Sequence, residues 1–137
     1  IGKEKYKNVE KRIQVILKQT EALRKRFLAL VDLDVQAYYK VFNSRKGNPN
    51  RYQINLVRAT KVPLEICKLS VEGSKFCPAL IKTANKYLLS DCLSAQQFLK
   101  SCFKSAEFNV IINFPLIKNK KFVLHAQKTI AALKKLI

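Results

Sequence analysis

The sequence predicts an all-α protein, a helical bundle of about five or six helices. Apolar residues recur every three or four positions through most of the chain, which is the period of a helix that buries one face. Only 3 Gly and 4 Pro occur, and hydrophobic residues make up 48% of the chain, a composition typical of a folded protein. Because 137 residues suit one hydrophobic core rather than two, we expect a single domain over residues 1–137.

The first expected helix is long and amphipathic. Lys and Arg occupy the face opposite its apolar positions, and a carboxylate near a new helix N-terminus stabilises the exposed amides there. We therefore expect Asp32 and Asp34 to mark the end of this helix or a kink, with a second piece running to about Phe42. Residues 43–50, rich in Asn, Ser, Gly and Pro, predict a loop. The buried face is expected at Tyr6, Val9, Ile13, Ile16, Leu17, Thr20, Leu23, Phe27, Leu30 and Val31.

The next helix is expected over roughly residues 51–72, with a break near Pro63. Proline costs about 3 kcal/mol in a helix interior but is tolerated in the first turn, so we expect Thr60 to cap a fresh helix there. Gly73 and Ser74 are expected to end this element, and Pro78 to start a short one.

Two further helices complete the predicted bundle. Ser90 and Asp91 are expected to open a helix that runs from residue 92 to about residue 108. The β-branched run at residues 110–112 has no obvious partner strand, so we interpret it as a helix tail that Pro115 ends. Residues 122–137 form the last amphipathic helix.

The charge of the chain is unusually high. The sequence contains 27 basic residues against 9 acidic residues, a net charge of +18. A field of this size attracts polyanions, whether nucleic acid, an anionic membrane surface or a polyglutamyl ligand tail. A solvated lysine-rich face without a ligand explains the same composition, so the charge alone names no partner. No apolar run approaches the roughly 20 residues of a membrane span, and nothing at the N-terminus resembles a signal peptide. We expect an intracellular protein, cytoplasmic or organellar.

Metal binding is not expected. Cys67, Cys77, Cys92 and Cys102 are too far apart in sequence to form the closely spaced ligand pairs of a zinc site, so we interpret them as buried free thiols. The single histidine, His125, is expected on the surface of the last helix.

Five sequence segments carry the most specific signal. They are Ile1–Tyr6 (IGKEKY), Leu30–Tyr38 (LVDLDVQAY), Ala59–Leu64 (ATKVPL), Asn85–Asp91 (NKYLLSD) and Phe108–Asn113 (FNVIIN). In this order and spacing they resemble the cyclodeaminase domain of formiminotransferase-cyclodeaminase and its methenyltetrahydrofolate cyclohydrolase relatives. The resemblance implies a cyclodeaminase-like helical fold, a homodimer or larger assembly with sites in grooves between helices, and a one-carbon tetrahydrofolate derivative as the ligand.

The chain also departs from the family pattern. The family has an earlier helix and a Gly-rich turn ahead of the Ile-Gly-Lys opening, so the resemblance implies a domain that lacks the family's first helices. Two functions follow: a folate cyclodeaminase or cyclohydrolase, or an inactive family member that serves as a basic subunit of an RNA-containing or other polyanionic assembly. The other departures are Ala84 for Gly, Tyr87 for Asn, and bulkier residues at Gln96, Gln97, Phe98, Phe103 and Glu107.

Asp91 is the predicted catalytic residue. It is the only acid between Glu72 and Glu107, and a carboxylate can stabilise a positive carbon centre or move a proton. The alternative is that Ser90 and Asp91 only cap the following helix, although a helix N-terminus can do both.

Four residues are predicted to bind the ligand. The resemblance implies this role for Asp34 and Ser90. The amides of Asn85 and Asn109 offer a donor and an acceptor together, which suits a pterin ring. Their alternative role is to satisfy local backbone, and that of Asp34 is to cap an exposed kink. If folate chemistry persists, Asn85, Asp91 and Asn109 should converge on one groove.

Overall fold

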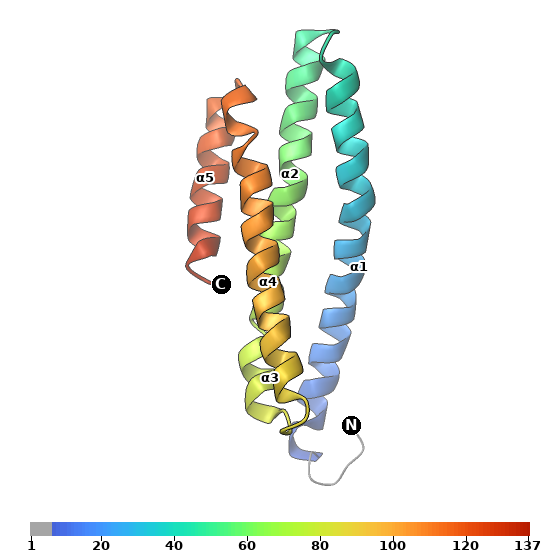
Figure 1. Ribbon diagram of the computed structural model, residues 1–137, viewed down its shortest axis with the longest axis vertical. Coiled ribbons are helices and arrows are strands. Elements are labelled where there is room, and N and C mark those ends of the chain that lie inside the picture. Colours follow the sequence, from blue (N-terminus) through green and yellow to red (C-terminus); the bar gives the residue numbers. More distant parts are fainter. Residues whose placement is uncertain (1–6) are drawn as a thin grey trace.

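The computed structural model describes residues 7–137, so the Ile1–Tyr6 segment lies outside the described residues. All regular elements of the described chain are helices and none is a strand, which confirms the predicted all-α class (Figure 1). Its elements are α1 Lys7–Ser44, α2 Pro49–Ser74, α3 Cys77–Thr83, α4 Leu89–Ile111, the 3-10 turn η2 Phe114–Leu116, and α5 Lys120–Lys134.

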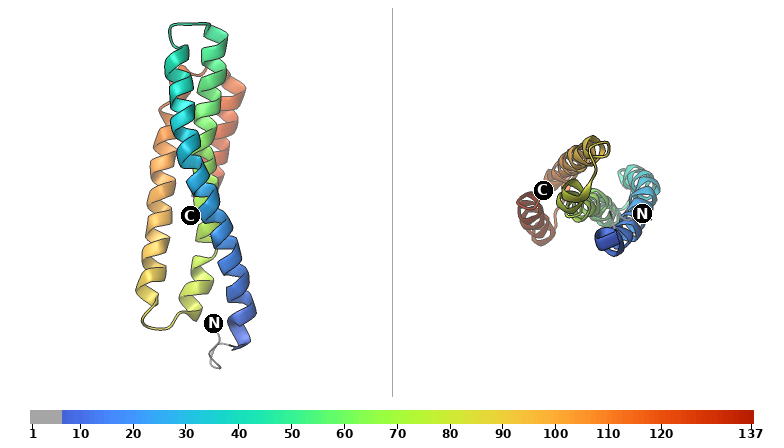
Figure 2. Two further views of the ribbon diagram at one scale, coloured as in Figure 1. Left: turned by 90° about the vertical axis from the view of Figure 1, so that its right-hand side faces the viewer. Right: turned by 90° about the horizontal axis from the view of Figure 1, so that it is seen from below.

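Helix α2 is the centre of the bundle. It packs against α1, α4 and α5, and the short helix α3 folds back against the N-terminal part of α4 (Figures 1 and 2). The α1–α2 loop and the α4–α5 connection lie at the same end of the molecule, at the top of Figure 1. Because α1 and α4 both pack on α2 and make little contact with each other, a hollow remains between them.

The predicted break at Asp32 and Asp34 is wrong, because α1 continues through both residues to Ser44. Both carboxylates are exposed in the middle of the helix, where they remain hydrated and do not compete for backbone amides. Helix α2 begins at Pro49, with the Asn48 Oδ1 accepting from the backbone N–H of Asn50 at 2.9 Å. The predicted loop at residues 43–50 is therefore shorter than expected.

The predicted break near Pro63 is also wrong. Helix α2 continues through Pro63, which lies in its interior. Thr60 is no cap, because its Oγ1 donates to the carbonyl of Leu56 at 2.8 Å. The apolar residues around Pro63 are buried against neighbouring helices, so tertiary packing outweighs the local cost of the proline. Without the two expected breaks, the described bundle has four long helices and the short α3.

Two apolar clusters form the core. The larger one joins α2, α4 and α5, and the smaller one joins α1 to α2 through Leu23, Leu30 and Leu69. Helix α4 includes Val110 and Ile111 and has Ile112 as its C-cap, which confirms that residues 110–112 form a helix tail rather than a strand. Val110 is fully buried. The larger cluster contains Leu64, Cys67, Val71, Phe103, Ala106, Val110, Ala126 and Ile130.

Glu107 is the one acidic side chain buried among the described residues. Its Oε2 accepts from Lys104 Nζ at 2.7 Å, and its Oε1 accepts from Lys134 Nζ at 3.1 Å. The hydrogen bond from Lys104 is the main cause that lowers the pKa of Glu107, and the bond from Lys134 adds to it. Glu107 therefore ties α4 to α5 as an ion pair.

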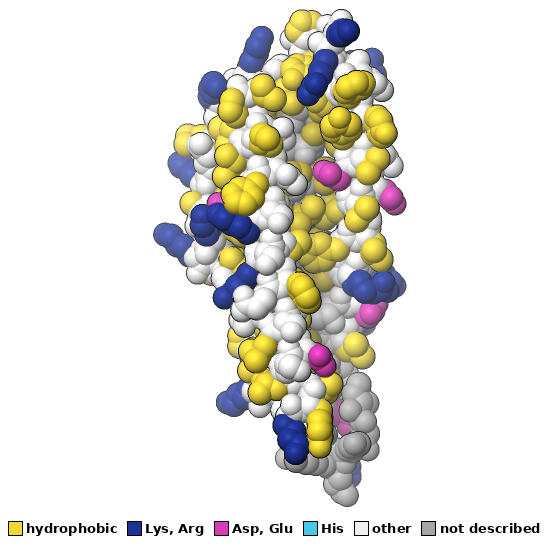
Figure 3. Space-filling view, viewed as in Figure 1, with side chains coloured by type: hydrophobic (Ala, Val, Ile, Leu, Met, Phe, Trp, Pro, Cys, Tyr) yellow, Lys and Arg dark blue, Asp and Glu magenta, His cyan; other side chains and the backbone are white. Residues whose placement is uncertain are grey.

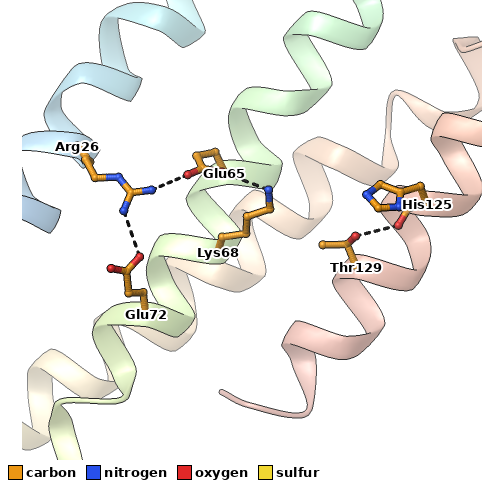
Figure 4. A network of polar contacts seen from close by, with 6 residues as sticks. All are labelled: Arg26, Glu65, Lys68, Glu72, His125 and Thr129. Carbon is orange, nitrogen blue, oxygen red and sulfur yellow. Dashed lines mark hydrogen bonds and ion pairs between the residues drawn. The ribbon is translucent and has the colours of Figure 1, made fainter.

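A second ionic connection ties α1 to α2. Arg26 donates to Glu65 at 2.7 Å and to Glu72 at 3.2 Å, while Lys68 pairs with Glu65 at 3.4 Å (Figure 4). These side chains are largely exposed, so they contribute more to the register of the two helices than to stability.

The histidine and cysteine predictions are confirmed in part. His125 is exposed on α5, and its carbonyl accepts from Thr129 Oγ1 at 2.9 Å (Figure 4). All four cysteines are free thiols, but Cys67 and Cys77 are buried whereas Cys92 and Cys102 are only half-buried. No helix in the described chain is both long and apolar enough to cross a bilayer.

Candidate functional site

A pocket of about 280 Å³ lies between α1, α2 and the C-terminal end of α4. Three of the five sequence segments meet in this pocket. Asp34 belongs to Leu30–Tyr38, Ala59 and Pro63 belong to Ala59–Leu64, and Asn109 and Asn113 belong to Phe108–Asn113. We call this cavity the three-helix pocket. It is lined by Asp34, Tyr38, Val41, Phe42, Arg45, Tyr52, Leu56, Ala59, Pro63, Asn109, Ile112, Asn113 and Leu116.

Asp34 and Asn109 are two polar side chains of the pocket that have no partner within the described chain. Neither side chain makes a hydrogen bond or ion pair with another described residue, and both are exposed to solvent. Most other acids in the described chain are paired: Glu65 and Glu72 with Arg26, and Glu107 with two lysines. The structure therefore leaves one carboxylate and one amide free to contact a ligand in the same pocket.

Aromatic rings form one wall of the three-helix pocket. The rings of Tyr38 and Phe42 stack with their centroids 6.2 Å apart and their planes 22° apart. The guanidinium of Arg45 lies over the Phe42 ring at 6.0 Å and adds a positive charge at the end of the pocket nearest the α1–α2 loop. Such a wall can make aromatic contacts with a planar heteroaromatic ligand.

Pro63 changes the hydrogen-bonding capacity of the α2 wall. In a helix each backbone N–H donates to the carbonyl four residues earlier, but proline has no N–H. The carbonyl of Ala59 therefore lacks its regular helical donor, and both Ala59 and Pro63 line the three-helix pocket. This wall can accept a hydrogen bond from a ligand N–H, which gives the Ala59–Leu64 segment a chemical role.

The hollow between α1 and α4 adjoins the three-helix pocket. It has a volume of about 720 Å³, and its lining is mostly apolar, with side chains from α1, α2, α3 and α4 (Figure 3). Asp34 lines both cavities, so the two adjoin at this residue. The two together offer a polar, aromatic end and a longer apolar trough.

Asn85, Ser90 and Asp91 lie near the opposite end of α4. Asp91 is in the first turn of α4 and Asn109 is in its last turn, so a helical rise of 1.5 Å per residue separates them by roughly 27 Å. The expectation that Asn85, Asp91 and Asn109 share one groove is therefore wrong within a single chain. Eighteen residues of continuous helix keep Asp91 and Asn109 at opposite ends of α4.

The local roles of these residues also differ from the expected ones. Leu88 occupies the N-cap position of α4, and no side chain caps that helix end, so the interpretation of Ser90 and Asp91 as caps is wrong. Asn85 Oδ1 accepts from the backbone N–H of Tyr87 at 2.9 Å and of Leu88 at 3.2 Å. Asn85 thus satisfies the local backbone of the α3–α4 turn, which was its alternative role.

Among the polar lining residues, the sequence analysis did not predict Tyr38, Arg45, Tyr52 and Asn113. Tyr38 follows Asp34 by one helical turn, and Asn113 follows Asn109 by the same interval, so helical spacing alone signalled both. Arg45 and Tyr52 lie on either side of the α1–α2 loop, and only the hairpin places them together. As to metals, no three His, Cys, Asp or Glu residues within 7–137 gather closely enough to hold an ion.

Comparison with known proteins agrees with this architecture. The sequence profile described as formiminotransferase-cyclodeaminase matches residues 1–132. The chain is 25% identical over 143 aligned positions to a methenyltetrahydrofolate cyclohydrolase of Methylorubrum extorquens, and the match covers 97% of this chain and 69% of that protein. It superposes with a TM-score of 0.94 on the crystal structure of formiminotetrahydrofolate cyclodeaminase from Thermotoga maritima, at 24% identity over 98% of this chain and 68% of that one. The chain belongs to the formiminotransferase-cyclodeaminase family.

Proposed function

We propose that this protein is a folate enzyme of the cyclodeaminase or cyclohydrolase type, acting on a one-carbon tetrahydrofolate derivative in the three-helix pocket. The proposal rests on one observation: the free Asp34 carboxylate and the free Asn109 amide line the same pocket. The two similar proteins, a methenyltetrahydrofolate cyclohydrolase and a formiminotetrahydrofolate cyclodeaminase, suggest the ligand class.

The lining of the pocket suits a pterin ring. The Tyr38 and Phe42 rings form the aromatic wall, and the Asn109 amide offers a donor and an acceptor at the ring edge. The carbonyl of Ala59 accepts from a ring or amino N–H. The apolar hollow adjoins the pocket at Asp34, so we assign the remainder of the ligand to that hollow.

Both candidate reactions need a carboxylate beside the one-carbon group of the folate. In the hydrolytic reaction water adds to the positively charged methenyl carbon, a C–O bond forms, one ring C–N bond breaks, and a proton is released. In the deaminating reaction a folate nitrogen attacks the formimino carbon and ammonia leaves. A carboxylate beside that carbon stabilises its positive charge and accepts the proton of the attacking group. We assign this role to Asp34, because no cation in the described chain neutralises it and it lines both cavities.

Asp91 is the second candidate for this role. It is exposed in the first turn of α4 and lines neither the three-helix pocket nor the hollow. For Asp91 or Ser90 to reach the ligand, a second copy of the chain must bring them there. The homodimer is a prediction of the sequence analysis, and a catalytic role for Asp91 requires that dimer.

Replacing each carboxylate by its amide tests the assignment. Asp34→Asn and Asp91→Asn each keep the size of the side chain and remove its charge. With 5-formiminotetrahydrofolate and 5,10-methenyltetrahydrofolate as substrates, we expect kcat of Asp34→Asn to fall on the order of a hundredfold or more and that of Asp91→Asn to stay near wild type. The reverse result transfers the role to Asp91. Folate binding without turnover in the wild-type chain identifies the protein as an inactive member of the family.

A further inference from the structure

One half of the bundle carries a strongly asymmetric charge. Residues 35–64 contain six Lys or Arg and residues 108–133 contain four, and neither segment contains an Asp or Glu. Both segments belong to the end of the bundle where the α1–α2 loop and the α4–α5 connection lie (Figure 1). None of these ten cations forms an ion pair with a described residue, whereas Arg24, Arg26, Lys68, Lys104 and Lys134 elsewhere do.

Five of these cations border a groove along α2. Two cavities, of about 610 and 450 Å³, share Ile54 and Arg58 and so run together. The cationic side chains that line them are Lys40, Arg51, Arg58, Lys61 and Lys118, and all five are exposed. We call this the cationic groove. No acidic or aromatic residue is among the described residues that line it.

Hydrogen bonds between elements fix both walls of the cationic groove. On the α1 side, Asn55 Nδ2 donates to the Lys40 carbonyl at 3.1 Å and to Ser44 Oγ at 3.2 Å. On the α5 side, Gln53 Oε1 accepts from the backbone N–H of Lys118 at 2.8 Å, and its Nε2 donates to the Leu116 carbonyl at 3.0 Å. The hydrogen bonds of Asn55 and Gln53 therefore hold the backbone of both groove walls in place.

The cationic groove is separate from the proposed folate site. Successive helical residues are rotated by about 100°, which places Arg51, Arg58 and Lys61 on the side of α2 roughly opposite to Ala59 and Pro63. A ligand in the three-helix pocket therefore does not share a face of α2 with the groove.

We propose that the cationic groove binds the phosphate backbone of a nucleic acid without reading its base sequence. A duplex carries one negative charge per roughly 1.7 Å of its axis, whereas an extended acidic peptide carries at most one per roughly 3.3 Å. A row of unpaired cations gains most from the ligand with the higher charge density, because more counterions are released. The absence of aromatic lining residues gives no platform for base stacking, so the contacts go to phosphates.

Fluorescence anisotropy with a short labelled RNA duplex tests this proposal. The groove variant Arg51→Gln/Arg58→Gln/Lys61→Gln is compared with the control variant Lys11→Gln/Lys18→Gln/Lys25→Gln, which removes the same charge from exposed positions near the other end of α1. Glutamine keeps the helix propensity of both segments. We expect the groove variant to bind about tenfold or more weakly and its log–log salt slope to fall by roughly 2 to 3, and the control to change little.

Three outcomes would overturn the proposal: equal losses in both variants, no duplex binding by the wild type, or equally effective competition by a polyglutamate peptide at the same charge concentration. Equal losses mean that only the overall field attracts RNA. Effective competition means that the groove is a general carboxylate or phosphate site. Folate turnover, measured on the same variants, should remain at the wild-type level. A failure of the nucleic-acid proposal is therefore distinguishable from a failure of the proposed enzymatic function.

Discussion

Replacing Glu107 by Gln should destabilise the protein in a pH-dependent way. The substitution keeps the side-chain volume and removes two charge-assisted hydrogen bonds, of 2.7 Å from Lys104 and 3.1 Å from Lys134. Hydrogen bonds to charged groups contribute about 1.5–3 kcal/mol each, but the lysine side chains are 50% and 55% exposed and regain water when the carboxylate is lost. We therefore expect the free energy of unfolding at neutral pH to fall by about 2 kcal/mol in total.

The pH dependence identifies the cause of that loss. The folded-state pKa of Glu107 lies below its ordinary value of 4.5, so the contribution is complete above that pH and disappears as the pH falls through the lowered pKa. Urea unfolding at several pH values should show the difference between wild type and Glu107→Gln shrinking in acid. Glu21→Gln is the matched control, because Glu21 pairs with Arg24 at an exposed site. An unchanged stability at neutral pH, or a difference that persists in acid, would refute the reasoning.

Two further predictions concern α2. Pro63→Ala restores an N–H that donates to the Ala59 carbonyl, so tetrahydrofolate affinity should fall about tenfold while the helix gains a hydrogen bond of about 1 kcal/mol. Calorimetric titration measures the affinity, and urea unfolding measures the stability. Pro49→Ala, in the first turn of α2, serves as the control. Unchanged affinity in Pro63→Ala would show that the Ala59 carbonyl does not contact the ligand. Burial raises the pKa of the Cys67 thiol to about 12, so a thiol reagent at mildly alkaline pH should label the half-buried Cys102 first and Cys67 only on unfolding. Peptide mapping by mass spectrometry checks this order, and early labelling of Cys67 would contradict its burial.

Local sequence rules predicted the helices well and their breaks poorly. The three-to-four-residue period identified α1, α2, α4 and α5, because amphipathic burial determines where long helices form. The break signals at Asp34 and Pro63 failed for one shared reason. Each residue is unfavourable for a helix locally, but the flanking Leu30 and Leu64 are buried against other helices, and that packing outweighs the local preference.

The candidate site was predictable only in part. The resemblance indicated Asp34, the chemistry of its amide indicated Asn109, and the structure brings both into the three-helix pocket. The role of Asp91 rested on its being an isolated acid in the sequence, which carries no information about distance along a helix. Arg45 and Tyr52 depend on how the α1–α2 hairpin closes, so no local pattern identified them.

A crystal structure of the full chain with a stable tetrahydrofolate analogue, such as 5-formyltetrahydrofolate, tests the central claim most directly. We predict density for the pterin ring in the three-helix pocket, stacked on the Tyr38 and Phe42 wall, with the Asn109 amide and the Ala59 carbonyl at its edge. The Asp34 carboxylate should lie beside the one-carbon group. A pterin ring bound at the α3–α4 turn beside Asn85 and Asp91 of the same chain, with the three-helix pocket empty, would contradict the account.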